Sequence, residues 1–206
     1  MEPMARYPSS GAQTDPCQNV TALRTACGMA RLIAAAGLTD DAYRASFKCA
    51  TWLGHHGRYH WRQRLDSGTF GKAYLDEAGR ESFWETFSSE GMRVAVFDLP
   101  KCGLPRPING IHLADWLVHG RYFGQPVSYP EALASEVVAR FGPAPPSRCG
   151  SRVPAYDDTE VREVLGYLRT SVARKRKAGI HYLASESWGL FMIAFNSGDP
   201  LIIERR

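Results

Sequence analysis

Apolar positions recur at helical spacing in five segments of the chain, each bounded by residues that favour helix ends. These segments are residues 21–37, 41–49, 83–91, 128–142, and a long segment that starts at Asp158. Ser82 can cap the third segment, and Ser128 with Glu131 three residues later has the pattern of a capping box. In the last segment the helical period is carried by Val161, Leu165, Leu168 and Val172.

Two short apolar runs, residues 92–97 and 190–195, have the composition of strands that are covered on both faces. The first run follows a predicted helix and a tight turn at Gly91. A further strand is expected at residues 111–117, after a loop that contains three prolines. Helix and strand signals therefore alternate, which predicts an α/β fold in which a sheet is flanked by helices.

The first 19 residues differ in composition from the rest of the chain, since they are rich in proline, serine and glycine. Such a segment buries too little apolar surface to offset the entropy of ordering, so residues 1–19 are expected to form a loose tail. Residues 20–206 are expected to form a single, incomplete α/β domain. No apolar run approaches the roughly 20 residues of a membrane helix and no secretory signal is recognisable, so a cytoplasmic protein is expected.

Charge and cysteine content add little to this description. The net charge is +4, a mild excess that favours anionic partners without requiring them. The five cysteines are spaced widely and irregularly, which indicates free thiols rather than a zinc site or a redox pair.

The densest group of functional side chains lies between Gly54 and Arg62, where three histidines and two arginines occur among glycines and aromatic residues. Imidazoles and guanidinium groups this close can bind phosphate or a metal. The candidate anion-binding residues are His55, His56, Arg58 and Arg62. The alternative is a hydrogen-bonded loop packed by Tyr59 and Trp61, without a ligand.

Two further features have a functional and a structural interpretation. Residues 174–177 are four consecutive cations, which either bind along a phosphate backbone or form a solvated helix face. A nucleic acid is not expected as the partner, because no side chain that reads bases lies among these cations. Asp98 directly follows the strand at residues 92–97, where α/β enzymes place catalytic or metal-binding carboxylates. The structural alternative for Asp98 is an Asx turn that caps the loop.

Three blocks of the sequence together resemble a known family. They are "GHHGRYHWRQ" at residues 54–63, "FWETFSSEGMRVAVFDLPKCGLPRPINGIHLADWLVHG" at 83–120 and "WGLFMIAF" at 188–195. In this order they are similar to the alkaline phosphatase superfamily, in particular to bacterial phosphohydrolases of the type I phosphodiesterase and nucleotide pyrophosphatase group. The resemblance covers residues 54–195 and implies part of an alkaline-phosphatase-like sheet. It also implies two divalent metals, usually zinc, beside a Thr or Ser nucleophile that attacks phosphorus.

The sequence departs from this family pattern at both ends of the resemblance. Thr51 is the hydroxyl nearest to the family's Gly-x-His-Gly turn and is the candidate nucleophile, although it lies closer to the turn than the family places it. After the strand at 190–195, Asp199 is the only carboxylate near the expected ligand position, and no histidine follows His181. The metal ligands therefore stay unassigned.

These observations predict a central fragment of a phosphoric ester hydrolase that lacks a complete active site, with a small phosphate ester as its substrate if it is active. Whether the chain is an enzyme stays open. The alternatives are a non-catalytic module that binds an anion or a partner, and a nonfunctional remnant of a disrupted gene, in which a buried strand would lie unpaired.

Overall fold

The computed structural model describes residues 18–28, 40–60, 62–65, 67–72, 81–101, 103–117, 124–145 and 158–195. Contacts divide the chain into two compact units, residues 1–36 and 37–206. In the first unit the structure describes the helix α1 (Gln18–Ala26) and the two residues after it, so the predicted tail lies almost entirely outside the described residues. The second unit contains the sheet.

The sheet of the second unit has four strands in the order β5–β4–β3–β6. They are β3 (Val94–Phe97), β4 (Gly110–Ala114), β5 (Val127–Tyr129) and β6 (Leu190–Ile193). β3 pairs in parallel with β4 on one side and with β6 on the other, and β5 pairs antiparallel with β4. The predicted α/β fold is confirmed, with β3 as a fully buried inner strand.

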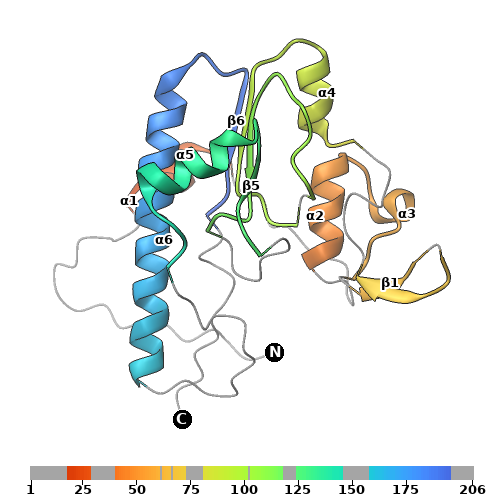
Figure 1. The fold of residues 1–206 in the computed structure, drawn as a ribbon, viewed down its shortest axis with the longest axis horizontal. Helices are drawn as coiled ribbons and strands as arrows, with labels where there is room; N and C mark the ends of the chain where they lie inside the picture. The colour runs from red at the N-terminus through yellow and green to blue at the C-terminus, as the bar shows by residue number, and fades with distance from the viewer. Residues whose placement is uncertain are drawn as a thin grey trace. The chain divides into compact units, whose positions relative to one another are not determined.

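Helices cover both faces of this sheet (Figure 1). They are α4 (Phe83–Ser89), α5 (Ala132–Phe141) and α6 (Asp158–Ser185). Alternate side chains of β3 face opposite layers: Ala95 and Phe97 pack in one core cluster with residues of α5 and α6, whereas Val94 and Val96 pack with Trp84 of α4. Because its successive side chains point to opposite faces of the sheet, β3 contributes to both apolar cores.

The segment that precedes α4 in the second unit is less regular. It contains α2 (Asp40–Cys49), the one-turn helix α3 (Leu53–His56), β1 (Arg62–Arg64) and β2 (Phe70–Lys72). The predicted helix at residues 41–49 is confirmed. Between residues 54 and 71, where the sequence shows no helical or strand period, the structure has α3 and an antiparallel pairing of β1 with β2, each too short to give a periodic signal.

The N-terminus of α5 differs from its predicted form. Helix α5 begins at Ala132, and Ser128 lies in β5 instead of serving as the N-cap. The Ser128 hydroxyl still accepts a hydrogen bond from the Ala134 N–H at 2.8 Å, but Glu131 makes no capping bond in return. The predicted capping box is therefore wrong. The Ser128 hydroxyl accepts an N–H of the first turn from a position within β5, and Glu131 occupies the N-cap position without a side-chain bond.

The buried face of α6 also differs from its predicted face. Leu165 and Val172 are exposed, although they continue the apolar period of the helix. The buried residues of α6 are Val164, Tyr167, Ser171, Lys175, Ala178 and Tyr182. Since this face includes a serine and a lysine, its burial requires polar partners within the protein.

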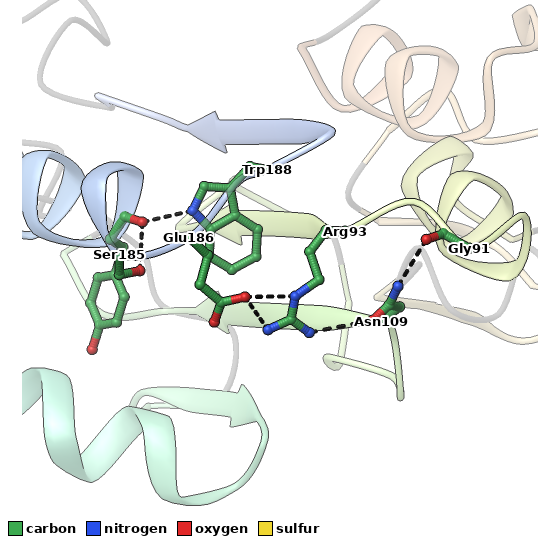
Figure 2. A network of polar contacts seen from close by, with 7 residues as sticks. Gly91, Arg93, Asn109, Ser185, Glu186 and Trp188 are labelled. Carbon is green, nitrogen blue, oxygen red and sulfur yellow. Dashed lines mark hydrogen bonds and ion pairs between the residues drawn. The ribbon is translucent and has the colours of Figure 1, made fainter.

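The amino edge of the sheet is held by a polar network around Arg93 (Figure 2). The Arg93 guanidinium donates to Glu186 and, at 3.3 Å, to the side-chain oxygen of Asn109. Asn109 in turn donates to the Gly91 carbonyl at 3.0 Å, and the Arg93 Cζ lies 5.5 Å from the centre of the Trp188 ring. These contacts tie together the starts of β3, β4 and β6.

Candidate functional site at the carboxyl edge of the sheet

The opposite edge of the sheet brings together the residues that follow β3 and β4. Asp98 follows β3, and its N–H donates to the Leu113 carbonyl of β4 at 2.7 Å. Asp115 follows β4. Both aspartates are buried and adopt positive φ angles, +56° for Asp98 and +58° for Asp115, a region that Asn, Asp and His enter more often than other residues with a side chain. Since β3 and β4 are parallel, this is the edge at which α/β proteins place their sites.

The carboxylate of Asp98 is surrounded by donors. Oδ1 accepts the Trp116 N–H at 2.8 Å, and Oδ2 accepts the Leu117 N–H at 2.7 Å. The Lys175 ammonium lies 2.9 Å from Oδ2 and donates a second bond to the Ala194 carbonyl at 2.7 Å. Asp98 therefore caps the loop after β4 and joins that loop to α6 and to the end of β6.

This ion pair is fully removed from solvent, because the Asp98 side chain is 0% and the Lys175 side chain 2% exposed. Burial lowers the pKa of Lys175 below that of a free lysine, and the negative charge and hydrogen bond of Asp98 oppose this shift. A buried pair of this kind is stable only when the charges compensate each other and hydrogen bonds satisfy their remaining atoms. Both conditions are met here.

Asp98 is not placed to hold a divalent metal. Catalytic metals of hydrolases require ionised carboxylates and neutral imidazoles with free lone pairs. Asp98 already accepts three bonds, and a metal beside it would face the Lys175 ammonium at close range. Among the residues that the structure describes, no three His, Cys, Asp or Glu side chains are grouped as metal ligands.

The histidine-rich segment is a hydrogen-bonded turn built around His56. This imidazole is buried, and its Nδ1 accepts the Arg58 N–H at 3.0 Å, so the proton of the neutral ring lies on Nε2. Nε2 lies 2.9 Å from the Ser46 hydroxyl of α2 and donates to it. His56 is thus oriented as a donor toward Ser46, and in this tautomer it does not act as a base that activates the hydroxyl.

Gln63 closes the same turn from β1. Its side-chain amide donates to the Gly57 carbonyl at 2.9 Å, and its oxygen accepts the Tyr59 N–H at 3.1 Å. Gly57 has a φ of +65°, which glycine tolerates without cost. Tyr59 is 47% exposed, and Trp61, the other ring of the predicted loop, lies outside the described residues.

The candidate site residues from the sequence do not present one common surface. His56 and Arg58 are buried, whereas His55 and Arg62 are exposed. The Arg58 Nε and the Thr51 hydroxyl are both buried and make no hydrogen bond within the part of the chain that the structure describes. Thr51 therefore has no described base within hydrogen-bonding distance, although a nucleophilic hydroxyl needs one.

The run of four cations at residues 174–177 is divided among three environments. Lys175 is buried against Asp98, Arg174 is half-buried at the end of α5, and Arg176 and Lys177 are exposed. The solvated-face interpretation is wrong for Lys175, whose burial depends on a partner far away in the sequence. No signal in the sequence connects Asp98 to Lys175, although the position of Asp98 after a strand singled it out.

Comparison of the chain with protein-family models, characterised proteins and solved structures gave no match. Among the helices that the structure describes, none combines the length and the apolar character needed to cross a membrane. The resemblance to the alkaline phosphatase superfamily thus rests on the three sequence blocks alone.

Proposed function

We propose that this chain belongs to the metal-dependent phosphoric ester hydrolases of the alkaline phosphatase superfamily and retains their scaffold without a complete hydrolytic centre. The observation that carries the proposal is the state of Asp98, the strand-end carboxylate best placed for catalysis. Its oxygens are engaged by two backbone N–H groups and by Lys175. In this role Asp98 stabilises the carboxyl edge of the sheet, and its oxygens are already occupied as hydrogen-bond acceptors.

The environment of Thr51 supports the same proposal. A phosphoryl-transfer nucleophile must be exposed to the substrate and activated by a base or a metal. The Thr51 hydroxyl is buried, and the nearby His56 is directed to Ser46. The described residues therefore supply no activated hydroxyl.

The sheet itself favours a folded scaffold over a gene remnant. A remnant is expected to leave a buried strand unpaired and prone to aggregate. The apolar strand β3 is instead paired on both sides, by β4 and by β6, and is covered by helices on both faces.

Hydrolysis assays test this proposal. The full chain would be incubated with an aryl phosphate monoester and an aryl phosphate diester, each with zinc, magnesium or manganese added. We expect no turnover above that of the metal alone, and no difference between the wild type, Thr51→Ala and Ser46→Ala. Metal-dependent turnover that either substitution abolishes, in a variant with an unchanged circular dichroism spectrum, would overturn the proposal.

A further inference from the structure

A cationic pocket opens between the end of α5 and the middle of α6, the two helices that lie on one side of the sheet in Figure 1. Its volume is about 410 Å³, within the range of pockets that hold small-molecule ligands. The lining residues are Arg140 and Phe141 of α5, and Arg169, Thr170, Ala173, Arg174 and Lys177 of α6. Four of these seven residues are cations and none is acidic.

The α6 side of the pocket is one face of the helix. Arg169, Ala173 and Lys177 follow one another at intervals of four residues, which places their side chains in a row along α6. The small Ala173 lies between the two cations and leaves the space of the pocket open. Arg169 and Lys177 are exposed, so both charges are accessible from solvent.

Arg174 is positioned by the end of α5. Its guanidinium donates to the Pro143 carbonyl and packs against Gly142, where an added Cβ would lie 3.0 Å from the Arg174 Cζ. Gly142 has a φ of +93°, which favours glycine at this position. Arg174 thus neutralises the carbonyl end of α5 and contributes its charge to the floor of the pocket.

Arg140 lies on the opposite wall, with its Cζ 5.8 Å from the centre of the Phe141 ring. The nearest acidic side chain along α5 is Glu136, whose carboxylate accepts the Tyr182 hydroxyl at 2.9 Å. Glu136 does not line the pocket. Four cations without an acidic neighbour in the lining attract an anion of several charges, and guanidinium groups bind phosphate oxygens in pairs.

The form of the pocket favours a small ligand over a nucleic acid. Proteins that bind single strands combine a long basic groove with aromatic rings on which bases stack. Phe141 is the only aromatic residue of the lining, and its ring is already in contact with the rings of Trp116, His181 and Tyr182. A compact chain of phosphoryl groups matches both the volume and the charge.

We infer that the pocket between α5 and α6 binds a chain of two or three linked phosphoryl groups, carried either by free polyphosphate or by a nucleotide. The guanidinium groups of Arg140, Arg169 and Arg174 bind the phosphoryl oxygens, and the Lys177 ammonium adds a fourth positive charge. This inference does not depend on the hydrolase proposal, since the pocket uses none of the residues of the carboxyl edge.

Isothermal titration calorimetry of the full chain with tripolyphosphate and with adenosine triphosphate, at low and at physiological salt, tests this inference. The double variant Arg169→Gln/Lys177→Gln removes two exposed charges, so its fold should be unchanged. We expect it to weaken both ligands at least tenfold, and wild-type binding to weaken as salt rises. Arg176→Gln removes a neighbouring exposed charge outside the lining and is expected to change affinity less than threefold.

The relative affinities identify the source of the phosphate chain. Equal binding of the two ligands supports free polyphosphate, and tighter binding of adenosine triphosphate supports a nucleotide. The inference is overturned if neither ligand binds at low salt, or if Arg176→Gln weakens binding as much as the double variant does. It is also overturned if a single-stranded oligonucleotide binds more tightly than both ligands through the same residues.

Discussion

Replacement of Lys175 by methionine removes one charge of the buried ion pair while it retains most of the side-chain volume. Asp98 keeps its bonds from the Trp116 and Leu117 N–H groups but loses the Lys175 ammonium that lies 2.9 Å from its Oδ2, inside a site that is 0% exposed. Removal of one partner from a buried pair costs about 3–5 kcal/mol, because the other charge is left uncompensated. The lost bond to the Ala194 carbonyl accounts for about 1 kcal/mol within this range.

Urea unfolding at neutral pH, followed by circular dichroism and by tryptophan fluorescence, measures this loss. With a slope of about 2 kcal/mol per molar urea, the midpoint of Lys175→Met should fall by about 2 M. The double variant Asp98→Asn/Lys175→Met should be more stable than Lys175→Met alone, since it removes both charges of the pair. Arg176→Met, a neighbouring exposed cation, should cost no more than about 0.5 kcal/mol.

The reasoning is refuted if Lys175→Met lowers the free energy of unfolding by less than about 1 kcal/mol, or by no more than Arg176→Met does. It is also refuted if the double variant is less stable than Lys175→Met alone. Either result would mean that Asp98 does not depend on Lys175 for its buried charge.

Three further predictions concern other parts of the described chain. Glu186→Gln should lower the free energy of unfolding by less than about 1 kcal/mol, because Glu186 and its partner Arg93 are each 41% exposed. The difference from the wild type should disappear in high salt, which urea unfolding at two salt concentrations measures. Gly110→Ala should lower the free energy of unfolding by about 3 kcal/mol or more in thermal unfolding, since its Cβ would lie 1.8 Å from a carbonyl oxygen of β3. Gly166→Ala should instead stabilise the protein by about 0.5–1 kcal/mol, because a Cβ at this position of α6 would meet no other atom within 4 Å. Burial, and after it the hydrogen bond that its hydroxyl donates to Glu136, raise the pKa of Tyr182. The protonated hydroxyl therefore contributes its full stabilisation of the folded state below the unfolded pKa of about 10, and this stabilisation is lost as the pH rises above that value. The free energy of unfolding should therefore fall more between about pH 9 and pH 11 in the wild type than in Tyr182→Phe.

The parts of the fold that the sequence predicted correctly have strong local signals. The uninterrupted apolar run of β3 and Ser82 at the N-cap of α4 are two examples. The strands β1, β2 and β5 have three residues each, which is too short for a periodic pattern to be recognised. Their pairing depends on neighbours that are distant in the sequence.

The candidate site shows the same division between local and long-range information. The position of Asp98 after a buried strand was readable, because the carboxyl end of such a strand is a frequent site in α/β proteins. Its pairing with Lys175 was not readable, since a lysine among four cations has the pattern of a solvated helix face. The buried face of α6 was missed for the same reason, because a helix that buries lysine and serine violates the apolar pattern.

The turn around His56 was predicted as one of two alternatives, a ligand-binding cluster or a hydrogen-bonded loop. The contacts of His56 with Ser46 and with the Arg58 N–H give it a structural role. Only the tertiary structure shows that Ser46 of α2 reaches this imidazole. The exposed His55 and Arg62 have no part in the described bonds of Gln63 and His56 that hold the turn.

The proposal that this chain is a phosphohydrolase scaffold without a complete hydrolytic centre is tested most directly by the rate of aryl phosphate diester hydrolysis in the presence of zinc. The wild type and Thr51→Ala would be compared at equal concentrations of folded protein. The account predicts that both rates equal the rate with zinc alone. A wild-type rate well above that background, lost in Thr51→Ala, would contradict it.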